Sequence, residues 1–333
     1  MAERISRRRM IGISAAAAGL SLLPFGKKHA AEANIVTWRG TALGALATLQ
    51  IHHPDRTVAE RLVERSLAEV RRLETIFSLY REDSALVALN RQGALVVPPA
   101  ELVALLFACQ RYARLTNGAF DPTVQSLWRL YSNHFSEPGA DPDGPPAGAV
   151  AEALARVGYH HVLVSRDRIA FAKRGMAITL NGVAQGYITD HVVDLLRGEG
   201  ITQTLVDMGE VRGVGNHPSG RPWAVGIADP DRPERARETL PIVNQAVATS
   251  GAYGFRFDRT GRFNHLFNPK TGASAYSYRS VSVIAPTATA ADALSTAFSL
   301  MPVADIDRVL AAIGEGAAHL IMPDGQIVVR GRA

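Results

Sequence analysis

The stretch that decides the organisation of this chain runs from Asn264 to Met301 and reads NHLFNPKTGASAYSYRSVSVIAPTATAADALSTAFSLM. Its last third is typical of a helix, with Asp292 in the first turn and Thr296 in the second. Residues four apart share one helix face, so a carboxylate and a hydroxyl point the same way. Such a pair suits a Mg²⁺ ion that keeps its other positions for phosphate and water. The competing interpretation is a capping box, with Thr289 as N-cap and Asp292 three residues later.

A histidine precedes that helix in a region rich in turn residues. His265 lies beside Asn268-Pro269 and Thr271-Gly272, which are typical of tight turns. A rigid corner of this kind would hold an imidazole in a defined position. We therefore expect His265 and Asp292 to be the candidate catalytic residues.

Other segments show the periodicity of helices and strands. Apolar residues recur at helical spacing from Thr57 to Leu79, which predicts an amphipathic core helix that brings Tyr80 to its end. The helix expected from Ala184 to Gly198 begins with small residues, and the free N–H groups of its first turn would bind phosphate. The remaining expected elements are strands at 42–53 and within 159–180, and helices at 99–117 and 124–134.

The first 33 residues have the form of an export signal. Consecutive arginines at Arg7, Arg8 and Arg9 precede a short apolar run, and small residues precede a plausible cleavage site after Ala33. This pattern is typical of a twin-arginine signal, so we expect export by that machinery to the periplasm. The apolar run is short and rich in alanine, which favours cleavage over a stable membrane anchor.

The signal also explains most of the net charge. Residues 1–33 hold six basic and two acidic side chains, so they supply +4 of the formal +5 and leave about +1 for residues 34–333. No basic stripe or zinc-finger spacing is present, so a nucleic-acid partner is not expected. The chain has a single cysteine, Cys109, in an apolar setting typical of a buried thiol.

Four blocks of this sequence, in family order, resemble the FAD:protein FMN transferase family, the ApbE type. They are FSLYREDSALVALN, TNGAFDPTV, ITLNGVAQGYITDHVVDLL, and the stretch from Ser250 to Met301. The resemblance implies an α+β fold with mixed, largely antiparallel sheets packed with helices. It also implies that residues 34–333 form one large catalytic domain.

The resemblance assigns roles to particular residues. Leu43 stands where the family usually has a methionine that packs near the flavin. The metal ligands would be Asp292, Thr296 and a backbone carbonyl near Gly182. The residues implied to bind FAD are Leu43, Tyr80, Ala119, Phe120, Asp121, Thr179, Gln185 and His265.

Three places in the sequence depart from the family pattern. Thr179 and Gln185 replace the usual acid and the usual lysine of the glycine-rich block, and Gly209-Glu210 stands where Gly-Gly-Asp is usual. Glutamine can donate a hydrogen bond but cannot offset phosphate charge. These changes resemble the exported NosX-like branch, which is associated with maturation of the flavoprotein that serves nitrous oxide reductase.

The resemblance implies a Mg²⁺-dependent transferase that moves FMN from FAD to a threonine or serine of an acceptor flavoprotein and releases AMP. A non-catalytic periplasmic protein that binds and delivers FAD is the alternative, because positions 179 and 185 have lost their charges. Hydrolysis of FAD to FMN and AMP is a third possibility, since water can replace the acceptor hydroxyl.

Overall fold

The computed structural model describes residues 34–42 and 45–332. The expected signal, residues 1–33, and the expected flavin neighbour Leu43 lie outside the described residues. Within the described part, no helix has the length and apolarity that a membrane crossing requires.

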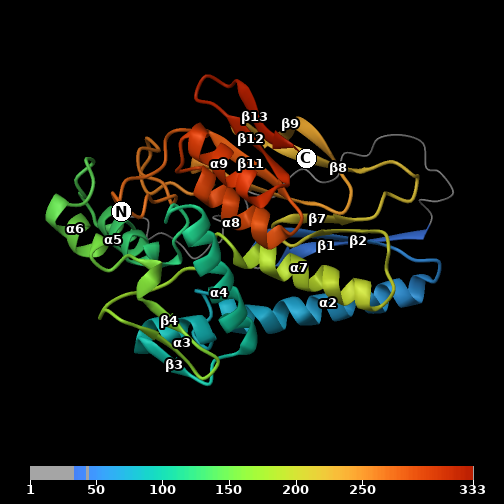
Figure 1. Ribbon diagram of the computed structural model, residues 1–333, viewed down its shortest axis with the longest axis horizontal. Helices are drawn as coiled ribbons and strands as arrows, with labels where there is room; N and C mark the ends of the chain where they lie inside the picture. Colours follow the sequence, from blue (N-terminus) through green and yellow to red (C-terminus); the bar gives the residue numbers. More distant parts are fainter. Residues whose placement is uncertain (1–33, 43–44, 333) are drawn as a thin grey trace.

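An eight-stranded antiparallel sheet forms the centre of the molecule (Figure 1). Every neighbouring pair is antiparallel, and three of the seven pairs are hairpins whose strands a short connection joins. Its strands, in spatial order, are β1 (Ile35–Ala42), β2 (Ala45–His52), β6 (Thr204–Asp207), β7 (Val211–Val214), β10 (Ala246–Ser250), β11 (Ser280–Ala285), β12 (Gly316–Ile321) and β13 (Ile327–Arg332).

The structure also contains two smaller sheets. A hairpin of β8 (Trp223–Asp229) and β9 (Arg232–Ile242) packs its apolar side chains against strands of the large sheet. A three-stranded sheet has the order β3 (Ala94–Val96), β5 (Arg168–Phe171), β4 (Val162–Val164). The expected α+β fold with largely antiparallel sheets is therefore confirmed.

Helices cover the other face of the large sheet and bury the main hydrophobic core. Figure 1 shows α2 and α7 lying side by side beneath β1 and β2, with α8 and α9 beneath the strands that follow. Cys109 is buried in this core, on α4. The helices are α2 (Arg56–Phe77), α3 (Ala85–Gln92), α4 (Ala100–Leu115), α5 (Gln125–Ser136), α6 (Ala147–Leu154), α7 (Ala184–Gly198), α8 (Ala288–Phe298) and α9 (Val303–Ile313).

A separate aromatic cluster holds the irregular segment 251–279, which follows β10. Its centre is Tyr131 of α5, whose ring lies 5.6 Å from that of Phe263 and 4.9 Å from that of Phe267, measured between centroids. Aromatic pairs at these distances contribute stability beyond the area that they bury. Because Phe263 and Phe267 are anchored in this way, the intervening His265 is held in place without regular secondary structure.

Candidate active site

Helices α7 and α8 cap each other through two buried aspartates. Asp190 of α7 accepts hydrogen bonds from the backbone N–H groups of Ala288 and Thr289 at the start of α8, each at 2.9 Å. In return, Oδ2 of Asp292 on α8 accepts the backbone N–H of Gly186 at 3.0 Å. Each carboxylate thus satisfies N–H groups that a helix start leaves unpaired.

Gly186 permits this close contact between the two helices. A Cβ at this position would lie 2.3 Å from the carbonyl oxygen of Ala288, a distance that no side chain tolerates. The glycine therefore brings the start of α7 within reach of Asp292. The expectation that free N–H groups of this turn bind phosphate is wrong for Gly186, because Asp292 already occupies that donor.

The capping-box interpretation of Asp292 is also wrong. The N-cap of α8 is Thr287, whose side chain accepts the N–H of Ala290. Thr289 instead donates its hydroxyl to Asp190 at 2.6 Å. Asp292 therefore caps the neighbouring helix and not its own.

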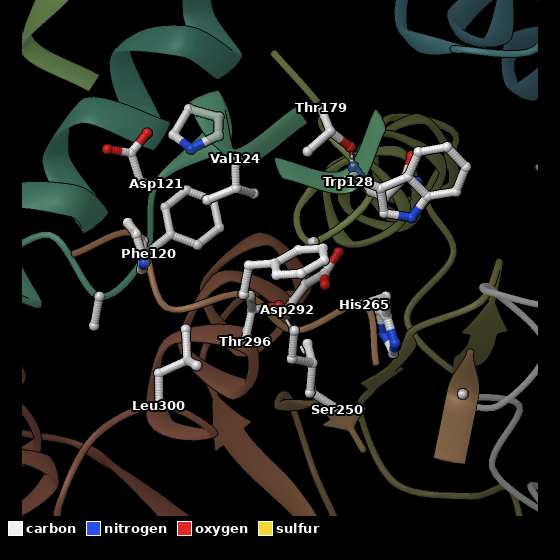
Figure 2. Close-up of a pocket in the computed structure, with 18 of the residues that line it drawn as sticks. Phe120, Asp121, Val124, Trp128, Thr179, Ser250, His265, Asp292, Thr296 and Leu300 are labelled. Carbon is white, nitrogen blue, oxygen red and sulfur yellow. Dashed lines mark hydrogen bonds between the residues drawn. The ribbon is translucent and has the colours of Figure 1, made fainter. Parts of the chain in front are cut away.

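One pocket gathers most of the residues expected at the site. Figure 2 shows Asp292 and Thr296 of α8 projecting into the space that His265 and Ser250 border. The pocket lining includes the expected residues Ala119, Phe120, Asp121, Thr179, Gly182, Gln185, His265, Asp292 and Thr296. Expected residues as far apart in the chain as Ala119 and Thr296 thus meet at one site.

Oxygen atoms cluster on the α8 side of this pocket. A Cβ built on Gly182 would lie 2.8 Å from the Thr296 hydroxyl, so the backbone of Gly182 closely approaches that side chain. The Ser250 hydroxyl lies 3.4 Å from that of Thr296 and 2.8 Å from that of Ser295. A carboxylate and hydroxyls beside the backbone of Gly182 are oxygen donors of the kind that Mg²⁺ prefers. Among the described residues, no group of three or more His, Cys, Asp and Glu side chains has a metal-binding arrangement.

Two buried carboxyl groups, those of Asp292 and Glu210, line the pocket. Burial raises the pKa of Asp292 to about 7, and the charge of Asp190 adds to this effect. Burial raises the pKa of Glu210 well above its usual range, helped by the charges of Asp292 and Asp207. The nearest buried cation in this network is Arg212, which donates to Asp190 at 2.6 Å. A divalent cation beside Asp292 would offset this negative charge, so the residues present fit a magnesium ion.

His265 presents its second ring nitrogen as an acceptor. Its Nδ1 lies 3.2 Å from the carbonyl oxygen of Phe255, and a carbonyl can only accept, so Nδ1 carries the proton. Burial lowers the pKa of His265 to about 4, although the bond to Phe255 opposes the shift. The imidazole is therefore neutral near pH 7, with Nε2 free to accept a proton.

Three of the expected FAD-binding residues have particular surroundings. The carboxylate of Asp121 accepts from the backbone of Thr123 and of Tyr159, each at 2.8 Å, so it shapes the loop that lines the pocket. Gln185 is buried, and its Nε2 has no hydrogen-bond partner within residues 34–42 and 45–332. Tyr80 does not line the main pocket but an adjoining groove, where its hydroxyl lies 3.4 Å from the amide nitrogen of Asn181. Asn181 lines both spaces.

Sequence reasoning gave no role to two acids of the site. Asp190 accepts hydrogen bonds from residues 98 and 99 positions away in the chain, and no local sequence pattern predicts contacts at that separation. Glu210 was visible only as a departure from the family pattern, although it lines the pocket and its backbone carbonyl accepts from Thr189 at 2.9 Å. A buried acid next to a glycine at the end of a strand is the signal that could have identified Glu210.

Comparison with known proteins gives a consistent result. An FAD:protein FMN transferase of Treponema pallidum is 33% identical over 283 residues, which is 77% of this chain and 75% of that protein. Another from Klebsiella pneumoniae is 28% identical and covers 86% of this chain and 84% of that protein.

Two solved structures share the fold over most of the chain. The apo form of the Pseudomonas stutzeri flavinyl transferase ApbE superposes with a TM-score of 0.75 and 27% identity, covering 90% of this chain and 94% of that one. The ApbE protein of Thermotoga maritima gives a TM-score of 0.76 and 30% identity, covering 89% and 97%. The model of the ApbE family matches residues 43–321, which include every element that lines the pocket, and this chain belongs to the ApbE family.

Proposed function

We propose that this protein is an FAD:protein FMN transferase that acts on a hydroxyl of an acceptor flavoprotein. The observation that supports this proposal best is the convergence of His265, Asp292, Thr296 and Gly182 on one pocket. Relatives that match about three quarters or more of the chain carry the name of this activity. The enzyme would consist of one catalytic domain, residues 34–333.

The reaction requires one bond to form and one to break. The acceptor hydroxyl oxygen attacks the phosphorus of the FMN half of FAD and forms a phosphoester. The P–O bond to the bridging oxygen breaks, and that oxygen leaves with AMP. The hydroxyl proton passes to Nε2 of His265, which is unprotonated because Nδ1–H is engaged with Phe255.

Asp292, Thr296 and the carbonyl of Gly182 are the residues that would hold Mg²⁺. When bound there, this ion supplies Lewis-acid stabilisation of charge on the pyrophosphate oxygens. The protein's own contribution is position: Asp292 is fixed by Gly186 and cannot rotate without breaking that hydrogen bond. Residues 119–121 and the buried amide of Gln185 line the pocket and would orient the nucleotide.

A second candidate function is supported by Gln185. It has no partner in the described part of the chain and brings no positive charge to the pocket. A protein that binds FAD tightly and delivers it without turnover would have the same pocket. Hydrolysis of FAD by water is the third outcome, since it uses the same residues.

We place the enzyme in the periplasm on the basis of the twin-arginine signal in residues 1–33, with a role in maturation of the nitrous oxide reduction system. Lysine in place of Arg7, Arg8 and Arg9 together should retain the protein in the cytoplasm. Periplasmic accumulation of that triple variant, measured by fractionation, would contradict the export proposal.

One experiment separates the three functions. The mature protein is incubated with FAD and Mg²⁺, with and without a candidate acceptor flavoprotein domain. The transferase yields AMP and an acceptor that gains the mass of FMN. A hydrolase yields AMP and free FMN without the acceptor, and a delivery protein yields neither product.

A further inference from the structure

A second groove lies next to the catalytic pocket and is built from aromatic and basic side chains. Tyr253, Arg256, Tyr276 and Arg279 line it, with Asn264 and Ala275. Tyr276 is 55% exposed, which is unusual for an aromatic residue of this size. Tyrosine and arginine are enriched where proteins bind other proteins.

The groove and the pocket share one thin wall. Arg256 and Asn264 are directly opposite each other in an antiparallel bridge, so their side chains project from the same face. His265 is the next residue and projects into the pocket, one Cα–Cα step of about 3.8 Å away. Likewise, Ala252 and Tyr253 line the groove, whereas Gly251 and Gly254 line the pocket.

Positive charge is concentrated in the segment of the chain that supplies most of the groove. Residues 251–279 hold five basic side chains and one acidic side chain, a net charge of +4. The whole chain carries +5 and residues 1–33 carry +4, so the rest of residues 34–333 carries −3. Arg262 pairs with Asp143, and Arg279 pairs with Asp231. Arg256 is exposed and forms no ion pair within the described ranges, so the groove keeps a free positive charge.

We propose that this groove docks an acidic segment of the acceptor protein beside the hydroxyl that receives FMN. This inference rests on the proposed transferase function and deepens it. An extended chain rises about 3.3 Å per residue, so a hydroxyl a few residues from the docked acids reaches the His265 side of the pocket. The imidazole that takes the hydroxyl proton lies on the wall that the groove shares, which is where an acceptor must arrive.

The phosphates of FAD are not the occupant of this groove. FAD carries two phosphates, and the proposed function places both beside Asp292 and Thr296 on α8. Arg256 and Asn264 line the groove and not the pocket, whereas Asp292 and Thr296 line the pocket and not the groove. A cationic groove at that place is complementary to carboxylates of a partner chain.

The test uses a pair of synthetic threonine peptides of equal length, one with four aspartates and one with four lysines around the threonine. Calorimetry with the mature protein should show that the acidic peptide binds at least roughly tenfold tighter at low salt. Arg256→Glu should remove most of that difference in affinity. Tyr276→Ala should weaken the binding of the acidic peptide roughly fivefold. FAD affinity should be unchanged in both variants.

Arg39→Glu on β1 is the matched control, because Arg39 is also exposed and forms no ion pair among the residues that the structure describes. It should bind the acidic peptide as the wild type does. Equal binding of the two peptides, or an Arg256→Glu variant that behaves like the wild type, would overturn the proposal. The proposal would also be overturned if both peptides bound equally well and the protein bound vesicles of anionic phosphatidylglycerol in a way that depends on Arg256. The surface would then face a membrane.

This result is independent of turnover. If the wild type releases no AMP and forms no FMN ester with an acceptor flavoprotein domain, the proposed transferase fails, whereas calorimetry still decides whether the groove binds acidic peptides. If transfer occurs, Arg256→Glu should raise KM for that domain and leave kcat unchanged, because it changes docking and not the reacting groups.

Discussion

The two walls of the catalytic pocket are built by different kinds of interaction. The wall of α7 and α8 is held by buried carboxylates that bind backbone N–H groups, as Asp190 and Asp292 do. The wall of residues 251–279 has little regular structure and is held by aromatic rings packed around Tyr131. Directional hydrogen bonds fix atoms at the site of charge development, whereas aromatic packing supports a surface that a partner can reach. The comparison predicts that removal of a carboxylate charge will disrupt the first wall. It also predicts that the second wall will lose stability in acid, mainly through protonation of His265.

The largest effect should come from Asp292→Asn. The amide oxygen can still accept the N–H of Gly186, so the fold is kept, while the negative charge beside Thr296 is lost. We expect AMP release from FAD to fall by roughly a thousandfold, since charge stabilisation dominates phosphoryl transfer. Thermal unfolding and AMP release should be measured on the same sample. A variant that turns over normally would show that Asp292 only holds the two helices together.

Next comes Asp190→Ala, which tests the structural role of the first wall. It removes the acceptor of the N–H groups of Ala288 and Thr289 and leaves the guanidinium of Arg212 buried without its partner. Loss of one member of a buried pair costs about 3–5 kcal/mol. Chemical denaturation gives this value, and Asp305→Ala, in an exposed pair with Arg308, is the control. A decrease in the free energy of unfolding of less than about 1 kcal/mol is typical of an exposed ion pair. Such a small decrease would contradict a tightly fixed wall.

His265 should make the second wall sensitive to acid. Its pKa is about 4 in the folded protein against 6.5 for the exposed group, so the unfolded chain binds the extra proton. The stability from a neutral His265 is fully present above pH 6.5 and is lost as the pH falls towards 4, at most about 3 kcal/mol. Denaturation between pH 7 and 4 should show a flatter decline in His265→Gln. Parallel profiles for the two proteins would show that the imidazole is not buried in the neutral form.

The smallest effect should come from Gln185→Lys, which restores the positive charge of the family pattern to the first wall. Gln185 contacts the backbone of Gly209, since a Cβ there would lie 2.1 Å from its Nε2. An ammonium group would sit near Glu210 and the phosphates, so FAD should bind roughly threefold tighter at low salt and less so at high salt. Titrations at two salt concentrations check this. Tighter binding by the glutamine form at both would indicate a pocket rebuilt around a neutral contact.

Local patterns predicted most of the scaffold. The helix expected from Ala184 to Gly198 has those bounds in the structure, because its small, periodic residues and its end at a charged turn leave little ambiguity. The strand expected over 42–53 corresponds to β2, and the helix over 57–79 to α2. Nine of the expected site residues line the pocket. The prediction that these residues share one site came from the family resemblance and not from their spacing along the chain.

The contacts that join α7 to α8 could not be predicted from the sequence, for a physical reason. Thr289 and Thr287 are equally good N-caps by residue type, and only the position of Asp190 decides that Thr289 turns away. The same holds for Asp292, whose capping partner is 106 residues distant. Such interactions depend on how two helices meet, which periodicity within either helix does not encode.

The single cysteine has a practical consequence for following acceptor docking. Cys109 is fully buried on α4, and burial raises the pKa of its thiol, so maleimide reagents should not modify the folded protein. A cysteine introduced at Arg259, which is exposed and belongs to the segment 251–279, would then be the one reactive thiol. A fluorophore attached there can report the arrival of a partner chain in real time, without removal of any native residue from the core.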